Sequence, residues 1–541
     1  MTSPSDRIHQ TRSGIPLKPW YGPEDVSDDA CASAEVGPGV APFARGAYSG
    51  MYRSKPWRIF QLSGYGSPEE LNDRLKFLLR SGETGIIMKR DRVTNDHLYD
   101  PDHPEVLSRR EDVGQTGCVL LSGRDVQRAI DGIPATETYA HPGAGVVQAA
   151  PFCLTSYWTA GMRQGARLDQ LQGTGQSDFF LTYVGCITKE QIPPHAGLRL
   201  NGDLIEFCTE KMPKWVPVSI AGYNGADSGL NAWQELGAVM ANAIEYLDMV
   251  EARGYSLDEF AKGIGGVNFR VSMDFFEDMA KLRAARKMWH NLLTRRYGVT
   301  DDKALRLRIH IVTAGSAMTY QQPLNNIVRG TLMALASVLG GTQSLGVSGY
   351  DEALSIPSDH AHQMSIRIQQ ILQHEPNLTS VADPLGGSYF IESLTESLEE
   401  KAWEFVDEIE KQGGFISSID SGWLQNRALD NQWSEISAIE EGTMEVVGVN
   451  MATDDVDAFP IDGFDGGGDA WERADARVRA LRTERHTRGA MTALEDLRKA
   501  CASDANVIPV LLDAVQADVS IGEVGEVFRD VFGTWESPIE M

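Results

Sequence analysis

The sequence predicts an α/β fold, built as a (β/α)8 TIM barrel with an N-terminal extension and a C-terminal helical appendage. Short runs rich in β-branched residues alternate repeatedly with longer helical patterns, which is typical of parallel strands covered by helices. The chain has 541 residues, and a single barrel takes up about half of such a length. Because no Gly-x-Gly-x-x-Gly motif opens after a first strand, a barrel is favoured over a doubly wound sheet.

The expected elements follow one another along the chain. The segment SPEELNDRLKFLLRSG (67–82) has the pattern of a capped helix, and longer helices are expected over 229–254 and 273–298. Buried parallel strands are expected at six apolar runs, namely TGIIMKR (84–90), GAGVVQAA (143–150), WVPVSIAG (215–222), GVNFRVSM (266–273), LRLRIHIVTAG (305–315) and TQSLGVSG (342–349).

Four parts are expected along the chain. Residues 1–44 form an N-terminal extension that makes subunit contacts, and 45–451 form the barrel, which becomes helical from about residue 388. Residues 452–476 are an acidic, Gly-rich linker, and 477–541 are the helical appendage. The string DGFDGGGD in the linker superficially suggests a calcium loop, but it lacks the spaced ligands and terminal Glu of an EF-hand.

Composition excludes several classes of function. A formal charge of −27 disfavours nucleic acid or anionic lipid as the main partner. No apolar run approaches the length of about eighteen residues that a membrane helix needs, and the N-terminus lacks the apolar core of a signal peptide, so a cytoplasmic location is expected. The six cysteines contain no Cys-x-x-Cys pair, which fits reduced thiols and gives no zinc framework.

A small cationic and aromatic strip, MYRSKPWRIFQLSGYG (51–66), stands out against this acidic background. Lys55 and Arg58 predict an anion site close to the start of the chain. The alternative is a solvated strand edge that carries two cations without a ligand.

Eight segments, in order and spacing, resemble the large, substrate-binding subunit of the coenzyme B12-dependent acyl-CoA mutases. That group contains methylmalonyl-CoA, isobutyryl-CoA and 2-hydroxyisobutyryl-CoA mutases. The segments are GIPLKPWYGPED (14–25), RGAYSGMYRSKPW (45–57), YDPDHPEV (99–106), GTGQSD (173–178), EKMPKWVPVSIAGY (210–223), FFEDMAKLRAARKMW (275–289), GGTQSLGVSGYDEALSIPSD (340–359) and NVIPVLLDAVQADVSIGEVGEVFRDVFG (506–533).

The resemblance implies a barrel whose central hole is threaded by the pantetheine arm of CoA. The strip would then line this channel and meet the CoA phosphates, although Phe60 stands where methylmalonyl-CoA mutases have a further arginine. The residues that the resemblance assigns to substrate or CoA binding are Tyr48, Met51, Lys55, Arg58, Gln176, Arg283 and Arg308.

The same resemblance implies adenosylcobalamin as the cofactor, with a radical formed by homolysis of its cobalt–carbon bond. Glu352 matches a glutamate that contacts the adenosyl ribose, and Gln343 matches a catalytic glutamine near the adenosyl group and the substrate. Ser348, Lys303 and His310 are further cofactor-binding candidates, and Lys303, Arg308 and His310 are placed on one strand. The alternative is that Gln343, Arg308 and His310 only satisfy hydrogen bonds at strand ends.

The Asp-x-His-x-x-Gly motif of the family's cobalamin-binding module is absent from the sequence, so no residue of this chain is expected to ligate the metal. A cobalamin-binding small subunit is therefore an expected partner, and the chain alone is expected to be inactive. The resemblance further implies a large-subunit dimer within a heterotetramer, and a G-protein chaperone.

Substrate-determining positions depart from those of methylmalonyl-CoA mutases. Cys186 and Leu62 replace the arginine and the tyrosine that pair with the free carboxylate, which predicts a non-dicarboxylic, branched acyl group of the 2-hydroxyisobutyryl or pivalyl kind. Lys89 stands where 2-hydroxyisobutyryl-CoA mutases have an aspartate, and a lysine there also suits a carboxylated substrate. A shift in strand register would instead turn Arg90 or Asp91 toward the pocket.

Asn224 aligns with the catalytic histidine that donates a hydrogen bond to the thioester carbonyl. An asparagine amide still donates but cannot act as an acid. Pocket positions that carry hydroxyls in the family are also apolar here, Ile87 among them. These changes predict a bulkier acyl group, a different reaction, or a catalytically silent CoA-binding scaffold.

Overall fold

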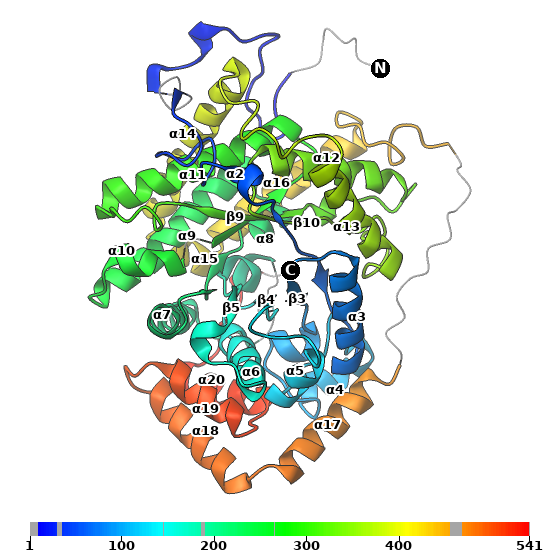
Figure 1. Cartoon of the computed structure of the whole chain (residues 1–541), viewed down its shortest axis with the longest axis vertical. Helices are drawn as coiled ribbons and strands as arrows, with labels where there is room; N and C mark the ends of the chain where they lie inside the picture. The colour runs from blue at the N-terminus through cyan, green and yellow to red at the C-terminus, as the bar shows by residue number, and fades with distance from the viewer. Residues whose placement is uncertain are drawn as a thin grey trace. The chain divides into compact units, whose positions relative to one another are not determined.

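The computed structural model describes residues 9–29, 35–143, 145–185, 190–264, 266–454 and 468–539. It divides the chain into two compact units, each assembled from separate segments of sequence. Unit 1 comprises Met1–Arg58, Gly222–Ile244 and Val267–Asp462, and unit 2 comprises Ile59–Ala221, Glu245–Gly266 and Gly463–Met541. Both units are mixed α/β structures that contain parallel strands (Figure 1).

The sheet of unit 1 has the strand order β1-β10-β9-β8. Its strands are β1 (Arg58–Ile59, where the unit's first segment ends), β8 (Gly266–Val271), β9 (Arg308–Thr313) and β10 (Ser344–Gly346). β10 runs parallel to β9 in the register Ser344 to His310 and Gly346 to Val312. β1 joins the edge through a hydrogen bond from the N–H of Arg58 to the carbonyl of Gln343, at 3.0 Å.

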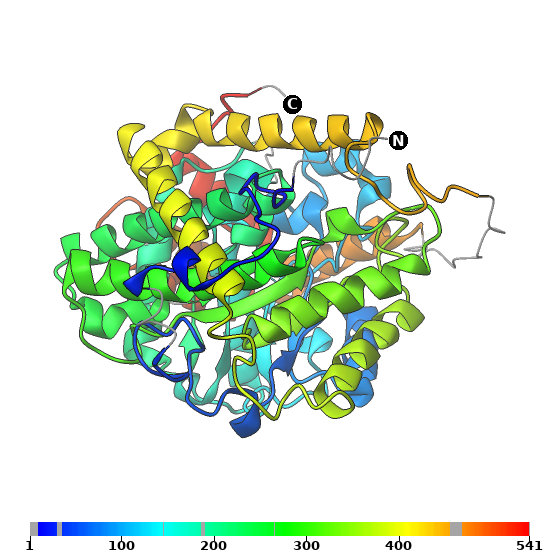
Figure 2. The same cartoon turned by 90° about the horizontal axis from the view of Figure 1, so that it is seen from above.

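The helices of unit 1 pack against one another. α11 packs against α12 and α14, and α12 packs against α13; Figure 2 shows α16 as the long gold helix of this unit. α9 crosses from unit 1 into unit 2 after Ile244. The helices are α2 (Met51–Ser54), α8 (Gly222–Asp227), α9 (Ala232–Ala252), α11 (Phe275–Tyr297), α12 (Asn325–Leu339), α13 (Asp359–His374), α14 (Tyr389–Lys411), α15 (Phe415–Asp420) and α16 (Trp423–Glu440), with 3-10 turns at Pro23–Asp25 and Gly315–Ala317.

Unit 2 has a second parallel sheet with the strand order β2-β3-β4-β5-β6. Its core covers one face of that sheet, because Ile86, Met88, Ala140 and Trp215 belong to one buried cluster together with side chains of the surrounding helices. The strands are β2 (Leu62–Ser63), β3 (Ile86–Met88), β4 (Tyr139–His141), β5 (Gln172–Thr174) and β6 (Trp215–Val216), and β7 (Ser219–Ile220) follows near the end of this segment.

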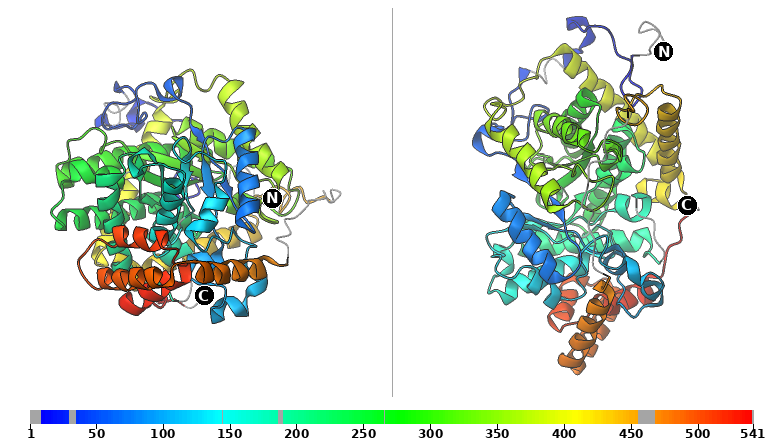
Figure 3. Two further views of the ribbon diagram at one scale, coloured as in Figure 1. Left: turned by 60° about the horizontal axis from the view of Figure 1, so that its bottom comes forward. Right: turned by 90° about the vertical axis from the view of Figure 1, so that its right-hand side faces the viewer.

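The C-terminal helices belong to unit 2 and form a group, drawn orange to red in Figure 3. α19 packs against α6, α7 and α18, and α18 packs against α20. The helices of unit 2 are α3 (Pro68–Ser81), α4 (Pro104–Ser108), α5 (Gly123–Ala129), α6 (Ala150–Arg163), α7 (Pro194–Lys211), α10 (Leu257–Phe260), α17 (Ala470–Glu484), α18 (Thr487–Cys501), α19 (Val507–Gln516) and α20 (Ile521–Phe532). Shorter turns lie at Arg92–Asp96, Arg110–Asp112, Leu168–Gln170, Phe180–Gly185 and Ala261–Gly263.

α3 illustrates how local sequence sets a helix. Ser67 accepts a hydrogen bond from the N–H of Glu70, and the Glu70 carboxylate accepts one from the N–H of Ser67 at 2.6 Å. Pro68 occupies the first turn, where its missing N–H costs nothing. Gly82 ends the helix with a φ of 115°, a conformation that glycine adopts without strain. The capped helix predicted at 67–82 is confirmed.

Most of the predicted strands and helices are present. β3, β8, β9 and β10 fall within four of the six predicted runs, and β6 and β7 divide a fifth, 215–222, around Pro217. α9 and α11 lie within the two predicted long helices.

The strand predicted at 143–150 is wrong, because β4 ends at His141, before that run begins. Pro142 offers no N–H, and Gly143 has a φ of 75°, so the extended chain cannot continue. Val146 and Val147 are buried ahead of α6 and do not form part of a named strand.

The helical character predicted for 492–533 is confirmed by α18, α19 and α20. Residues 455–467 of the predicted linker lie outside the described residues, and α17 begins at Ala470, inside the predicted linker. The four-part division of the chain remains a prediction.

Across the described residues, no helix is long and apolar enough to cross a membrane. Cys118, Cys153, Cys208 and Cys501 are free, buried thiols, as the sequence predicted. In the same part of the chain, no group of His, Cys, Asp and Glu side chains is arranged to hold a metal ion.

Candidate functional site

In unit 1 the candidate residues gather where β9 and β10 begin and end. Gln343 precedes β10, and its side-chain oxygen accepts a hydrogen bond from the N–H of Ile309 at 2.8 Å. Its amide nitrogen donates to the carbonyl of Gly341, also at 2.8 Å. Both ends of the amide therefore bind backbone groups at a strand end, which is the alternative that the sequence left open for this residue.

His310 and Arg308 lie on β9, two residues apart. Nδ1 of His310 is 2.8 Å from Oγ of Ser344 on the neighbouring strand. Both side chains are half-buried. The prediction that Lys303 lies on the same strand is wrong, because β9 begins only at Arg308. Lys303 is exposed in a preceding turn that the carboxylate of Asp301 stabilises by accepting its N–H at 2.8 Å.

Ser348 connects the loop after β10 to the end of β9 through two hydrogen bonds to Thr313. Its N–H donates to Oγ1 of Thr313 at 2.8 Å, and its own hydroxyl donates to the carbonyl of Thr313 at 2.7 Å. Ser348 thus positions the loop that carries Glu352.

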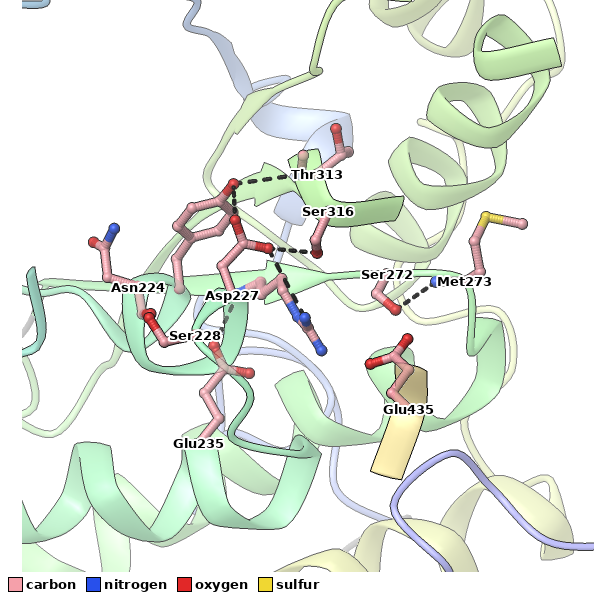
Figure 4. A network of polar contacts seen from close by, with 12 residues as sticks. Asn224, Asp227, Ser228, Glu235, Ser272, Met273, Thr313, Ser316 and Glu435 are labelled. Carbon is pink, nitrogen blue, oxygen red and sulfur yellow. Dashed lines mark hydrogen bonds and ion pairs between the residues drawn. The ribbon is translucent and has the colours of Figure 1, made fainter. Parts of the chain in front are cut away.

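Asp227, at the end of α8, is the centre of a polar cluster in unit 1 (Figure 4). One of its oxygens accepts a hydrogen bond from the hydroxyl of Tyr223 at 3.2 Å, and the other accepts one from Ser316 at 2.6 Å. The guanidinium of Arg270 lies 3.9 Å from the same carboxylate. The N–H of Gly315 donates to the Tyr223 hydroxyl at 3.4 Å, so the cluster joins α8 to the turn that follows β9.

Glu352 interacts electrostatically with Asp227, the central residue of this cluster. Desolvation by surrounding protein atoms raises the pKa of Glu352 to about 7, and the carboxylates of Asp351 and Asp227 act in the same direction. The residue as a whole is nevertheless exposed. An exposed carboxyl edge can accept hydrogen bonds from the hydroxyls of a sugar, and this capacity increases when the group is ionised.

Asn224 precedes the cluster on α8 and is half-buried. Its backbone carbonyl accepts hydrogen bonds from the N–H and the hydroxyl of Ser228, at 3.1 and 2.8 Å. In Figure 4 its amide points away from the Asp227 carboxylate. The Asn224 side chain therefore points away from the polar cluster, although Asn224 and Asp227 lie on the same short helix.

Beneath this cluster lies a buried ionic group that the sequence analysis missed. Lys281 is 2.7 Å from Glu235 and 2.8 Å from Asp278, and all three side chains are at most 7% exposed. Glu235 also accepts the backbone N–H of Arg270 at 2.8 Å, which connects the group to β8. Although burial opposes it, attraction from Asp278 and Glu235 raises the pKa of Lys281. Asp278 lies one turn before Lys281 on α11, but Glu235 comes from α9, so the sequence of one helix does not reveal the whole group.

The N-terminal strip carries two exposed cations, Arg53 and Lys55. Lys55 is exposed directly after α2, whereas Met51 is buried and has a φ of 37°. Tyr48 is 43% exposed, and its ring centroid lies 6.0 Å from the guanidinium carbon of Arg306. Arg58 is half-buried on β1. The two alternatives for the strip, an anion site and a solvated edge, both fit this arrangement.

Arg283 was a predicted CoA-binding residue, but its guanidinium lies in the interior of unit 1. It pairs with Asp383 and Glu392, and all three side chains are at most 7% exposed. Arg45 adds a second cation to Asp383 at 2.8 Å. This arrangement favours a structural role for Arg283, and its contact with CoA remains a prediction.

In unit 2 the predicted selectivity residues share one face of the sheet. Leu62 on β2 is opposite Ile87 on β3, and Lys89 follows two residues after Ile87, so the alternation of side chains places all three on the same side. Leu62 is 51% exposed, Ile87 is 7% exposed, and Lys89 is half-buried.

The structure decides between Lys89 and its neighbours. Arg90 is fully buried, and its guanidinium donates to the carbonyls of Pro142, Leu120 and Cys153. Asp91 is also fully buried and accepts the N–H groups of Thr94 and Gly114. Lys89 is therefore the charged residue of this run whose side chain retains exposed surface.

Of the remaining candidates, Gln176 is half-buried after β5, and Cys186 lies outside the described residues. His141, the last residue of β4, was not among the predicted residues, and it pairs with Ile87 on the same face. The predicted strand at 143–150 began two residues too late to include it.

The sequence of the chain is similar to those of known proteins. Residues 10–534 match the model of the methylmalonyl-CoA mutase family. The large subunit of 2-hydroxyisobutanoyl-CoA mutase from Aquincola tertiaricarbonis is 34% identical over 98% of this chain and 93% of its own length. Methylmalonyl-CoA mutase from Cereibacter sphaeroides is 34% identical over 99% of this chain and 74% of its own, and the human mitochondrial enzyme is 32% identical over 98% and 69%. The chain therefore belongs to the methylmalonyl-CoA mutase family of acyl-CoA mutases.

Proposed function

We propose that the chain is the large, substrate-binding subunit of an adenosylcobalamin-dependent acyl-CoA mutase. The substrate would be a branched, non-dicarboxylic acyl-CoA of the 2-hydroxyisobutyryl or pivalyl kind. The observation that carries this proposal is the pair Leu62 and Ile87, an aliphatic surface at the predicted selectivity position. Placing an ionised carboxylate against such a surface costs about 3 kcal/mol, whereas a branched hydrocarbon fits it.

The fold that we propose for this activity is the eight-stranded barrel. β1 and β2 are separated only by Phe60 and Gln61, and β6 and β7 only by Pro217 and Val218. If each of these pairs is one bent strand, the ten strands β1 to β10 become eight, the number of a TIM barrel.

Residues of this chain would bind CoA and orient the acyl group. Lys55 and Arg58 would contact the CoA phosphates, and Tyr48, Met51, Gln176 and Arg308 are further proposed contacts. Asn224 would donate its amide N–H to the thioester carbonyl, which it can do without a proton transfer. Leu62, Lys89 and Cys186 would set the selectivity for the acyl group.

The residues of unit 1 fit the adenosyl part of the cofactor, because the Glu352 and Asp227 carboxylates are acceptors suited to sugar hydroxyls. When bound, adenosylcobalamin supplies a carbon-centred radical by homolysis of its cobalt–carbon bond. Glu352 would hold the ribose, Ser348 would fix the loop beneath it, and Gln343, Lys303 and His310 would line the adenosyl site. Closure around these groups would exclude water from the radical.

A separate small subunit is the proposed carrier of the corrin. The Aquincola relative, of which the chain covers 93%, is named a large subunit. We propose a heterotetramer built around a large-subunit dimer, served by a G-protein chaperone.

A second candidate function rests on Lys89. Its half-buried side chain shares a face with Leu62, while Arg90 and Asp91 are occupied elsewhere. An ammonium in this place could pair with the carboxylate of an acidic acyl-CoA. Lys89→Ala should then abolish turnover of methylmalonyl-CoA, whereas turnover of a neutral acyl-CoA should change by less than about fivefold. Lys211→Ala, at an exposed lysine of α7, is the matched control.

The deciding experiment is a turnover screen. The full chain, a cobalamin-binding small subunit and adenosylcobalamin are mixed with 2-hydroxyisobutyryl-CoA, pivalyl-CoA, isobutyryl-CoA and methylmalonyl-CoA, and the products are separated by chromatography and identified by mass. Isomerisation of a neutral branched acyl-CoA is expected. Turnover of methylmalonyl-CoA alone would move the function to the second candidate. Assembly and CoA binding without any product would indicate a silent scaffold.

A further inference from the structure

The place of His141 in the sheet of unit 2 directs its side chain toward the face that carries Leu62. β2, β3 and β4 run parallel, with Leu62 opposite Ile87 and Ile87 opposite His141. Partners in a parallel ladder project their side chains to the same face. The other face, with Ile86, Met88 and Ala140, is fully buried in the core. His141 therefore belongs to the same surface as the proposed acyl site, one strand beyond Ile87.

A backbone contact fixes the orientation and tautomer of the imidazole. The N–H of Gly143 donates to Nδ1 of His141 at 3.1 Å. Gly143 has a φ of 75°, and a Cβ at this position would lie 1.4 Å from the carbonyl oxygen of Met88, so only glycine fits here. Since Nδ1 accepts a hydrogen bond, the proton of the neutral ring is on Nε2.

The ring is neutral under ordinary conditions. Burial lowers the pKa of His141 to about 4, and protonation of Nδ1 would also place two donors face to face. Nε2–H is consequently a fixed, uncharged donor on the opposite side of the ring from Gly143. A donor of this kind suits a carbonyl oxygen, whereas a phosphate or carboxylate would favour a cation.

We propose that His141 is a binding residue for the acyl-CoA and donates a hydrogen bond from Nε2 to a carbonyl oxygen of the ligand. The inference rests on the proposed function. The acceptor is either the thioester carbonyl or an amide carbonyl of pantetheine, which share the same chemistry. In either position, His141 adds a neutral polar contact to a face that is otherwise aliphatic at Leu62 and Ile87.

The test measures the affinity of the full chain, assembled with its small subunit, for two probes by calorimetry. Isobutyryl-CoA has the thioester carbonyl, and S-isobutyl-CoA is a thioether that lacks it. His141→Phe should weaken isobutyryl-CoA binding about tenfold, the usual effect of losing one hydrogen bond to a buried partner. His141→Gln, whose amide also donates, should recover part of the loss. His195→Phe, at an exposed histidine of α7, should leave both affinities within about twofold of the wild type.

The two probes identify the acceptor. A loss confined to isobutyryl-CoA assigns the thioester carbonyl, and an equal loss for both probes assigns a pantetheine amide. Unchanged affinity of His141→Phe for both probes would overturn the inference while leaving the proposed function intact. If the wild-type assembly binds neither probe, the proposed function itself fails and the inference fails with it.

A second measurement applies if His141→Phe does not fold. In protein labelled with nitrogen-15 at histidine, the Nε2 resonance that is missing from His141→Gln belongs to residue 141. It should have the shift of a protonated, neutral Nε2 at pH 7 and should move when isobutyryl-CoA is added. A resonance that is unprotonated at Nε2, or that does not respond to the ligand, would contradict the proposal.

Discussion

The polar cluster of unit 1 and the face of the unit 2 sheet that carries Leu62 differ in how their side chains are held. In unit 1, Tyr223 and Ser316 both donate hydrogen bonds to Asp227, and Lys281 pairs with both Glu235 and Asp278. In unit 2, Leu62, Ile87, His141 and Lys89 lie on one face of the sheet. Residues that hold each other through several bonds cannot be exchanged singly, whereas an aliphatic face tolerates substitution.

This difference suggests a division of labour. We expect the interlocked side chains of unit 1 to serve what all members of the family share, the CoA and adenosyl groups. We expect the face of unit 2 to set which acyl group is accepted. The following predictions test this comparison, beginning with the largest expected effect.

Breaking the buried ionic group of unit 1 should give the largest loss of stability. Lys281→Met leaves Glu235 and Asp278 buried without their cation, and the free energy of unfolding should fall by about 3–5 kcal/mol. Urea unfolding followed by circular dichroism measures the change. Lys499→Ala removes a cation from exposed pairs with Glu495 and Asp496 in unit 2 and should cost less than about 1 kcal/mol. Equal losses of unfolding free energy in the two variants would contradict the expectation that the buried ionic group stabilises unit 1 more than an exposed ion pair stabilises unit 2.

Unit 2 buries a carboxyl in a different way, at Glu83. Burial raises the pKa of Glu83 to about 8, and the backbone N–H of Gln61 binds one of its oxygens. The unfolded chain releases this proton near pH 4.5, so the stability contributed by Glu83 is complete below that pH and is lost as the pH rises to about 8. Glu83→Gln should remove that decline, making the variant more stable than the wild type at pH 8 by on the order of 2 kcal/mol.

Thermal unfolding of both proteins between pH 4.5 and 8.5 provides the measurement for Glu83. Glu69→Gln, at an exposed carboxylate on α3, is the control and should keep the decline. The expectation fails if the wild-type and Glu83→Gln curves run parallel across this range.

Glu352 should make binding of the cofactor depend on pH. Its carboxyl ionises near pH 7, and the ionised form accepts hydrogen bonds from ribose hydroxyls more strongly. The affinity of the assembled protein for adenosylcobalamin should therefore rise as the pH increases through 7. Glu352→Gln should weaken binding at pH 8 about tenfold and flatten the pH profile. An unchanged profile in this variant would remove Glu352 from the adenosyl site.

The smallest effect is expected at the face of unit 2. Leu62→Tyr fills space beside Ile87, so the KM for a branched neutral acyl-CoA should rise about fivefold while kcat changes less. Steady-state kinetics with 2-hydroxyisobutyryl-CoA measures both constants. Leu107→Tyr alters another exposed leucine of the same unit and should have no effect. If Leu62→Tyr lowers kcat and leaves KM unchanged, the residue would act on the reaction itself and not on the fit of the acyl group.

Sequence alone determined the mixed α/β class of the fold and several of its elements. Apolar runs with β-branched residues identified β3, β8, β9 and β10, and helical periodicity identified α9 and α11, because these patterns reflect burial on one face of each element. It failed at β5, Gln172–Thr174, whose short polar run has no apolar signal, and at β4, where the apolar residues 146 and 147 follow the strand.

Only tertiary structure decided which candidate residues are accessible. Arg283 has the charge expected of a CoA ligand, but its position on α11 buries it between Asp383 and Glu392. Lys89 and Arg90 are adjacent cations, and the pairing of β3 with its neighbours turns Arg90 into the interior and leaves Lys89 with exposed surface. His141 lies on the same face as Ile87 because β4 pairs with β3. The identity of a side chain is local, whereas its burial and its partners depend on residues far away in the chain.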